Sequence, residues 1–131
     1  MQQRNGDTMV YVIDDDSSVR RAMLRLMRSA GLNASAFSSV DEFLAVDFSA
    51  DNTCVVADVH MSGIDPLDLP SLLEKKGKSP PVIFITANDT PETRSRVRKA
   101  GAAGYFRKPV DGQALIDLIH WALSEQSQST N

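Results

Sequence analysis

The sequence predicts an α/β fold in which a doubly wound parallel sheet of five strands carries helices on both faces. Five short apolar runs are separated by amphipathic segments along the whole chain, and this alternation is typical of strands joined by crossover helices. The runs are rich in Val, Ile and aromatic residues, as strands buried on both faces are. They occupy residues 9–13, 34–37, 54–57, 82–85 and 104–106.

The first two helices have clear sequence signals. Between the first two strands, apolar residues recur at the spacing of one helix face, and Gly31 is placed to end that helix. The residues of this face are Val19, Ala22, Met23, Leu26, Met27 and Ala30. Ser39 and Glu42 have the spacing of a capping box, which predicts the start of a short second helix. Its apolar face consists of Val40, Phe43 and Leu44.

Prolines mark the starts of the third and fourth helices. Pro66 and Pro70 fall near the start of the third helix, residues 67–76, where proline is tolerated within the first turn. Thr90 followed by Pro91 indicates an N-cap and a first helical residue, so a fourth helix with few apolar residues is expected to about residue 100.

The fifth helix opens near Asp111 and is followed by a Ser- and Gln-rich tail that we expect to be a linker or a frayed end. Its apolar face consists of Leu115, Leu118, Ile119, Ala122 and Leu123. These limits divide the chain into an N-terminal extension (1–8), one domain (9–123) and a polar tail (124–131).

Composition and charge fit one soluble domain. The 131 residues are 42% hydrophobic and 24% charged, near the averages for globular domains. A formal net charge of −3 gives no basic field for nucleic acid, so this domain itself is expected not to bind it. No apolar stretch approaches the roughly 18 residues that a membrane span needs. The lone cysteine, Cys54, is expected to be a small buried hydrophobe. These observations predict a cytoplasmic protein with no membrane partner.

Six polar residues stand just past the carboxyl ends of the predicted strands. They are Asp14, Asp15 and Asp16 after the first strand, Asp58 after the third, Thr86 after the fourth and Lys108 after the fifth. In a parallel sheet these ends share one edge, where ligands of doubly wound folds bind. Carboxylates in one crevice repel each other unless a cation lies among them. A Mg²⁺ ion held by carboxylate oxygens and water commonly offsets this repulsion in proteins. The pattern predicts a Mg²⁺ site.

The same residues fit phosphoryl transfer. Beside a metal, an ionised Asp58 can attack phosphorus, while the Thr86 hydroxyl and Lys108 stabilise the phosphoryl oxygens. The residues therefore predict a phosphoryl acceptor.

Four segments, taken together and in order, resemble the receiver domain of bacterial two-component response regulators. They read VYVIDDD (10–16), VVADVHM (55–61), IFITA (83–87) and AGAAGYFRKP (100–109), within a resemblance that covers about residues 8–123. The resemblance implies a flavodoxin-like three-layer sandwich with strand order 2-1-3-4-5. It also implies a signalling phosphoacceptor, not an enzyme, that catalyses its own phosphorylation by a histidine kinase and its slow dephosphorylation.

The resemblance assigns roles at the acidic site. Asp58 is implied to be the phosphoacceptor. Mg²⁺ is implied to bind Asp15, Asp58 and the backbone carbonyl of His60 directly, and Asp14 mainly through water. Asp16 lies outside this metal set.

Further roles follow around that site. Thr86 and Lys108 are implied to contact the phosphoryl oxygens, and Tyr105 occupies the position of the aromatic rotamer switch. Pro109 is implied to follow a cis peptide bond, which is least costly before proline. Phosphorylation is implied to alter protein association through the fourth helix, fifth strand and fifth helix. The implied partners are the kinase, a phosphorylation-dependent homodimer and a downstream output domain or protein.

Two positions depart from the family pattern. Ser62 stands where the family usually has proline, and Pro66 stands where it usually has glycine at the start of the third helix. The loop and the start of that helix are therefore expected to differ. His60 and Asn88 occupy the positions that tune autodephosphorylation in the family.

Several alternatives stay open. A phosphorylation-independent interaction module is disfavoured because the set of Asp14, Asp15, Asp58, Thr86 and Lys108 is complete. A Mg²⁺-dependent phosphatase with an aspartyl intermediate lacks a clear general acid. The chain is expected to be a stand-alone regulator or a receiver from a larger one. The basic residues of the fourth helix form either a solvated face or a surface for an acidic partner: Arg94, Arg96, Arg98 and Lys99. Trp121 lies off the apolar stripe of the fifth helix, either exposed or covered by a partner.

Overall fold

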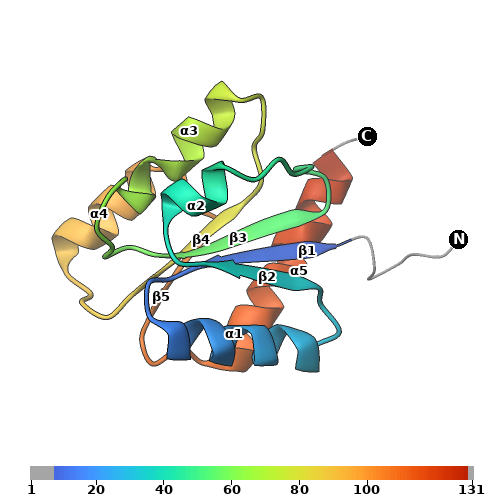
Figure 1. The fold of residues 1–131 in the computed structure, drawn as a ribbon, viewed down its shortest axis with the longest axis horizontal. Helices are drawn as coiled ribbons and strands as arrows, with labels where there is room; N and C mark the ends of the chain where they lie inside the picture. Colours follow the sequence, from blue (N-terminus) through green and yellow to red (C-terminus); the bar gives the residue numbers. More distant parts are fainter. Residues whose placement is uncertain (1–7, 130–131) are drawn as a thin grey trace, which may run out of the picture.

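Strands and helices alternate through residues 8–129, the part of the chain that the computed structural model describes (Figure 1). In chain order the elements are β1 (Met9–Ile13), α1 (Ser17–Ser29), β2 (Ala34–Phe37), α2 (Val40–Leu44), β3 (Thr53–Asp58), η2 (Pro66–Asp68), α3 (Leu69–Lys75), β4 (Val82–Thr86), α4 (Pro91–Lys99), β5 (Gly104–Arg107) and α5 (Gly112–Ser129). Within this range no helix has the length and apolar content to cross a membrane.

The five strands form one parallel sheet in the order β2-β1-β3-β4-β5, which confirms the expected fold class. The register aligns the carboxyl ends of the three central strands. Ile13 at the end of β1 pairs with Ala57 of β3, and Asp58 pairs with Ile85 of β4. The chain therefore leaves these strands at one edge of the sheet.

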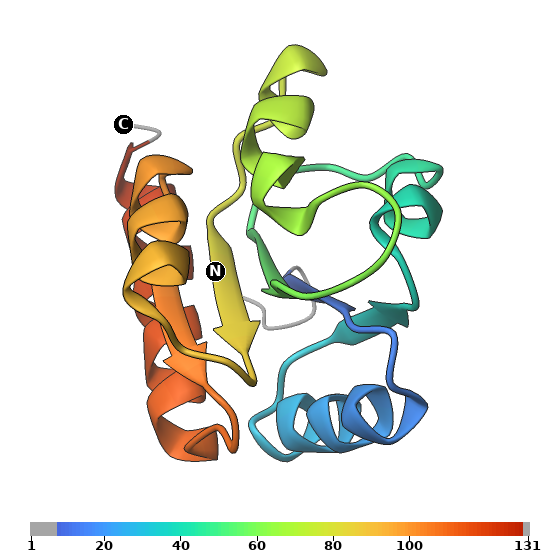
Figure 2. The same cartoon turned by 90° about the vertical axis from the view of Figure 1, so that its left-hand side faces the viewer.

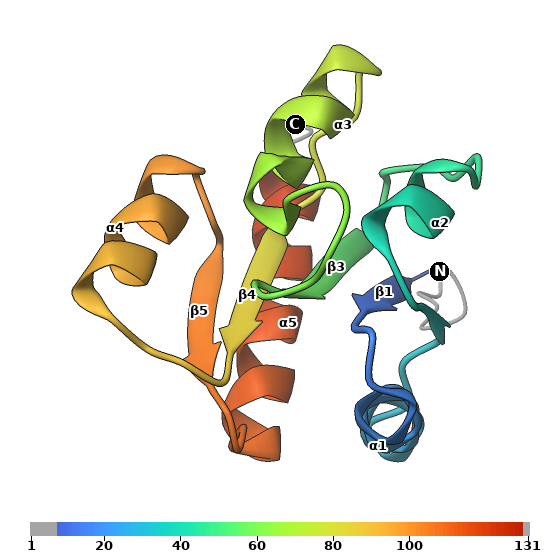
Figure 3. The same ribbon diagram turned by 60° about the vertical axis from the view of Figure 1, so that its left-hand side comes forward.

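Helices cover both faces of the sheet. Helices α1 and α5 lie on one face, and α2, α3 and α4 lie on the other (Figures 1 and 2). Each side has its own apolar core, and every residue of β3 and β4 is buried. Burial on both faces explains why these strands are continuous apolar runs in the sequence. Figure 3 shows α4 on the β5 side of the sheet, with α1 on the β1 side.

Side chains and backbone at the starts of α2, α4 and α5, and at the end of α1, confirm the predictions made for those four helix ends. The Ser39 hydroxyl caps α2 by accepting from the Glu42 N–H at 3.0 Å, and the Thr90 hydroxyl caps α4 in the same way. The Asp111 carboxylate accepts from the backbone N–H of Ala114 at the start of α5. Gly31 follows α1 with a φ of +75°, a left-handed conformation that favours glycine.

The start of the third helix differs from the prediction. Residues 66–68 form a turn of 3₁₀ helix, and α3 begins at Leu69 with Pro70 in its first turn. The Asp65 carboxylate caps the turn by accepting from the Leu67 N–H at 3.0 Å. Pro66 fits as the first residue of the turn because its missing N–H would have had no helical partner there. The loop before it contains Gly63, with a φ of +86°.

The end of the fifth helix also differs from the prediction. Residues 124–129, which we expected to be a linker or a frayed end, continue α5 to Ser129. Gln126 supplies the physical reason. Its amide nitrogen donates to the carbonyl of Ala50 at 2.7 Å, and its amide oxygen accepts from the N–H of Thr53 at 3.2 Å. These contacts dock the last turns of α5 against the start of β3, information that composition does not carry.

Candidate functional site

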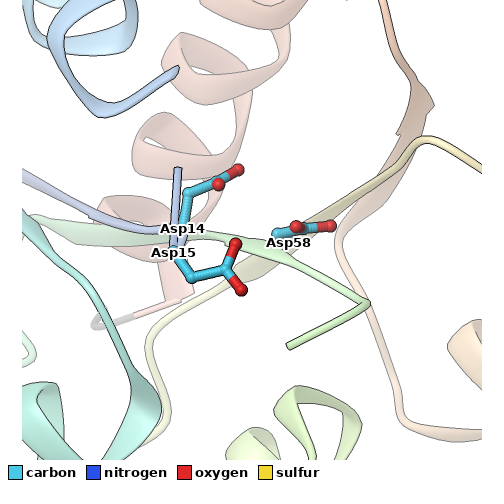
Figure 4. Close-up of side chains that lie close together, drawn as sticks. All are labelled: Asp14, Asp15 and Asp58. Atoms are coloured by element: carbon cyan, nitrogen blue, oxygen red, sulfur yellow. The ribbon is translucent and has the colours of Figure 1, made fainter. Parts of the chain in front are cut away.

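Three carboxylates meet at the carboxyl edge of the sheet. Asp14 and Asp15 directly follow β1, and Asp58 ends the adjacent β3; their side chains point into a common space (Figure 4). One oxygen from each lies within 4.8 Å of the others. Asp14 and Asp58 are 4% and 7% exposed, whereas Asp15 is open to solvent. Clustered carboxylate oxygens are ligands for a hard divalent cation, so this cluster is able to hold one.

Local hydrogen bonds fix the loop that carries two of these carboxylates. Asp14 Oδ1 accepts from the N–H of Asp16 at 2.9 Å, and the Asp16 carboxylate caps α1 by accepting from the Ser18 N–H. Arg20 reaches back from α1 and donates to the backbone carbonyl of Asp14 at 2.8 Å. Asp16 is thus engaged in starting the helix, which places it outside the acidic cluster.

Lys108 neutralises part of the cluster. Its ammonium lies 3.0 Å from Asp14 Oδ2 and 3.6 Å from Asp58 Oδ2. Burial lowers the pKa of Lys108, but the hydrogen bond to Asp14 and the charges of Asp14 and Asp58 outweigh burial and raise that pKa. Lys108 therefore remains a cation at neutral pH. The peptide bond from Lys108 to Pro109 is cis, the conformation expected from the sequence.

The electrostatic environment of Asp58 is divided. Burial raises the pKa of its carboxyl group, and the charges of Asp14 and Asp15 raise it further. The N–H of His60, which donates to Asp58 Oδ1 at 3.3 Å, and the Lys108 charge act in the opposite direction, but the net shift is upward. A cation among the carboxylates favours the ionised form that a nucleophile needs.

Thr86 ends β4, next to the strand that carries Asp58, and its side chain is fully buried. Its hydroxyl is engaged with the loop that follows: it accepts from the N–H of Asn88 at 3.0 Å and donates to the Asn88 carbonyl at 3.2 Å. Among residues 8–129 no hydrogen bond joins this hydroxyl to Asp58.

A family model, the response regulator receiver domain, matches residues 10–120. The chain belongs to this receiver family. It is therefore a phosphoacceptor signalling domain of a two-component system, as the sequence predicted.

Three relatives illustrate the receiver match. The chain is 35% identical over 115 residues to the transcriptional regulatory protein TdiR of Thauera aromatica, covering 88% of this chain and 51% of TdiR. It is 34% identical over 119 residues to the transcriptional regulatory protein FixJ of Azorhizobium caulinodans, covering 91% of this chain and 56% of FixJ. A receiver structure from Burkholderia phymatum superposes with a TM-score of 0.77 at 39% identity, covering 90% and 96% of the two chains. This receiver thus spans about half the length of TdiR and FixJ.

The receiver fold brings some predicted residues to the acidic cluster and leaves others apart from it. Lys108 joins the three carboxylates, and His60 lies with Asp15 in the wall of a shallow depression of about 520 Å³. Tyr105 is engaged elsewhere, because its hydroxyl donates to Asp89 Oδ1 at 2.9 Å.

The contacts of the basic helix in this receiver were missed from the sequence. Arg94 donates to Asp89 Oδ1 at 2.9 Å, and Arg96 lies 2.6 Å from Asp65 Oδ2. Two of the four basic residues of α4 thus form ion pairs within the domain. The sequence alone indicated only a solvated face or a surface for an acidic partner. Asp89 directly precedes the cap of α4, where an acid is ordinary, so no sequence signal marks its contact with the distant Tyr105.

Proposed function

We propose that Asp58 accepts a phosphoryl group from the phosphohistidine of a histidine kinase in the cytoplasm. The observation that carries this proposal is the pairing of Asp58 with the Lys108 cation beside Asp14 and Asp15. This arrangement places a nucleophilic carboxylate, a cation for the phosphoryl oxygens and ligands for a metal within one small volume. Residues 9–123 form the proposed receiver domain.

The transfer exchanges one bond for another. A carboxylate oxygen of Asp58 forms a bond to phosphorus while the bond from phosphorus to the histidine nitrogen breaks, and the imidazole leaves with that electron pair. The product is an aspartyl phosphate. Lys108 lies where its ammonium can donate to a phosphoryl oxygen. The Thr86 hydroxyl can do the same after it leaves Asn88.

The donor set fits Mg²⁺, because clustered carboxylates with room for water are what this ion takes. Asp15, Asp58 and the carbonyl of His60 are the proposed direct ligands, with Asp14 acting through water. When bound, the ion offsets the charge of the carboxylates and of the phosphoryl oxygens. The domain then catalyses its own phosphorylation.

The proposed output is a change in protein association. Thr86 and Tyr105 both contact the loop between β4 and α4, which supports transmission of a change at the acceptor to α4 and β5. The proposed switch also includes α5. The proposed partners are a second copy of this chain, in a phosphorylation-dependent homodimer, and an output domain or protein.

Acetyl phosphate tests the acceptor directly, because acetate leaves in place of imidazole. We expect intact-mass measurement to show one Mg²⁺-dependent phosphoryl adduct in the wild type and none in Asp58→Asn. Asp117→Asn, which changes an exposed acid of α5, is the matched control and should retain the adduct. If Asp58→Asn accepts phosphate at the wild-type rate and site, the assignment is wrong.

A further inference from the structure

Two neighbouring residues of the loop between β4 and α4 hydrogen-bond to Thr86 and to Tyr105. Asn88 binds the Thr86 hydroxyl through both its N–H and its carbonyl, at 3.0 and 3.2 Å. The next residue, Asp89, accepts from the Tyr105 hydroxyl at 2.9 Å. The hydrogen-bond partners of Thr86 and of Tyr105 are thus adjacent in the chain.

Asp89 ties three elements together. Its Oδ1 atom accepts from Arg94 of α4 at 2.9 Å as well as from Tyr105 of β5. The Asp89 side chain is 21% exposed, so these contacts are partly shielded from solvent. Burial and the contact with Asp89 raise the pKa of Tyr105 to about 12, which keeps the phenol a hydrogen-bond donor at neutral pH. Hydrogen bonds to a partly shielded charge are stronger than those between neutral groups.

The position of Asp89 opposes movement of Thr86. The Thr86 hydroxyl cannot donate to a phosphoryl oxygen while its one O–H donates to the Asn88 carbonyl. Moving it breaks both bonds with the Asn88 backbone. The contacts of Asp89 with Tyr105 and Arg94 hold the adjoining backbone where it makes those bonds. They therefore favour the arrangement in which the Thr86 hydroxyl is bound to Asn88.

We propose that Asp89 is a positioning residue that holds the loop, and through it Thr86, in an arrangement unready for the phosphoryl group. The proposal rests on the proposed function and adds the residue that sets how readily the acceptor site closes. A ligand that binds only when the Thr86 hydroxyl has left Asn88 must shift the equilibrium against these contacts. Removing them therefore strengthens binding of such a ligand.

Beryllofluoride with Mg²⁺, a mimic of the phosphoryl group, is the probe, and its affinity is measured by calorimetry. We expect Asp89→Ala to bind it about three- to tenfold more tightly than the wild type, the range that one or two lost hydrogen bonds give. Tyr105→Phe keeps the ring and removes the donor, so it should also bind more tightly. The double variant should gain less than the sum of the two, because both single changes break one contact. Glu92→Ala removes an exposed acid from the first turn of α4 and should leave the affinity unchanged.

A purely structural role for Asp89 would lower the melting temperature without tightening binding. Unchanged or weaker binding in Asp89→Ala, with normal binding by the wild type, overturns the positioning role and leaves the acceptor assignment standing. If Asp89→Ala does not fold, Tyr105→Phe tests the positioning role on its own. Unchanged binding of beryllofluoride by Tyr105→Phe would then contradict that role. Absence of both beryllofluoride binding and an acetyl phosphate adduct in the wild type would instead remove the proposed function itself.

Discussion

Cys54 shows how strongly a single position in the sheet is shielded. Its side chain has no exposed surface, and burial raises the pKa of the thiol to about 12 from 9.0. The raised pKa lowers the thiolate fraction at neutral pH about a thousandfold. We expect iodoacetamide to alkylate Cys54 at least about a thousandfold more slowly in the native protein than in urea, as followed by intact mass. Complete labelling within minutes without denaturant would contradict this burial.

The raised pKa of Cys54 makes the stability of the fold depend on pH. The folded thiol holds its proton above the pH at which the unfolded thiol loses it. The contribution of Cys54 is therefore constant below about pH 9 and destabilises the fold progressively as the pH rises from about 9 toward 12.

Residues at strand ends could be predicted from the sequence, whereas the loop contacts could not. Asp14, Asp58 and Lys108 each follow an apolar run, so the parallel topology alone brings them to one edge. The contact of Asp89 with Tyr105 joins residues 16 apart through a loop whose path no local pattern determines.

At the scale of elements, α5 gives the sharpest test. Gln126 joins the last turns of α5 to Ala50 and Thr53 through hydrogen bonds of 2.7 and 3.2 Å. We expect Gln126→Ala to lower the free energy of unfolding by about 1–2 kcal/mol, because it leaves partly buried backbone groups without these partners. Urea unfolding measures the loss. Hydrogen exchange should also accelerate in the last turns of α5.

Glu125→Ala is the matched control for this change. Glu125 is exposed beside Gln126 on the same helix, so its removal should change the stability little. Equal effects of the two variants would show that the helix end is held by propensity rather than by docking. Propensity and composition predicted a tail there because the decisive contacts come from residues more than seventy positions earlier.

The start of α3 shows the same limit in another form. Two prolines near Leu69 indicated a helix start but not which of them begins the α-helix. Asp65 caps a 3₁₀ turn that comes first, and its other carboxylate oxygen pairs with Arg96 of α4. The spacing of the two prolines does not distinguish this turn from the first turn of an α-helix.

For the whole molecule, the ionised carboxylate that the site needs at Asp58 lowers the stability of the fold. Burial and neighbouring charges raise the pKa of Asp58, so its ionised form destabilises the folded state. Because the folded pKa lies above the unfolded one, stability falls as the pH rises through that interval and stays lower above it. In metal-free buffer at neutral pH, Asp58→Asn should therefore melt at a higher temperature than the wild type.

Mg²⁺ should offset this loss of stability, since a ligand that binds the folded state stabilises it by mass action, by about 2.7 kcal/mol at a hundred times its dissociation constant. We expect calorimetric melting of the wild type to shift upward with Mg²⁺ concentration, and that of Asp58→Asn to shift less because one proposed ligand is neutral. Sodium chloride at equal ionic strength separates screening of the carboxylates from binding. Equal shifts with both salts would show screening of the carboxylates without specific binding of Mg²⁺. Equal responses of both proteins to Mg²⁺ would place the metal elsewhere than among Asp14, Asp15 and Asp58.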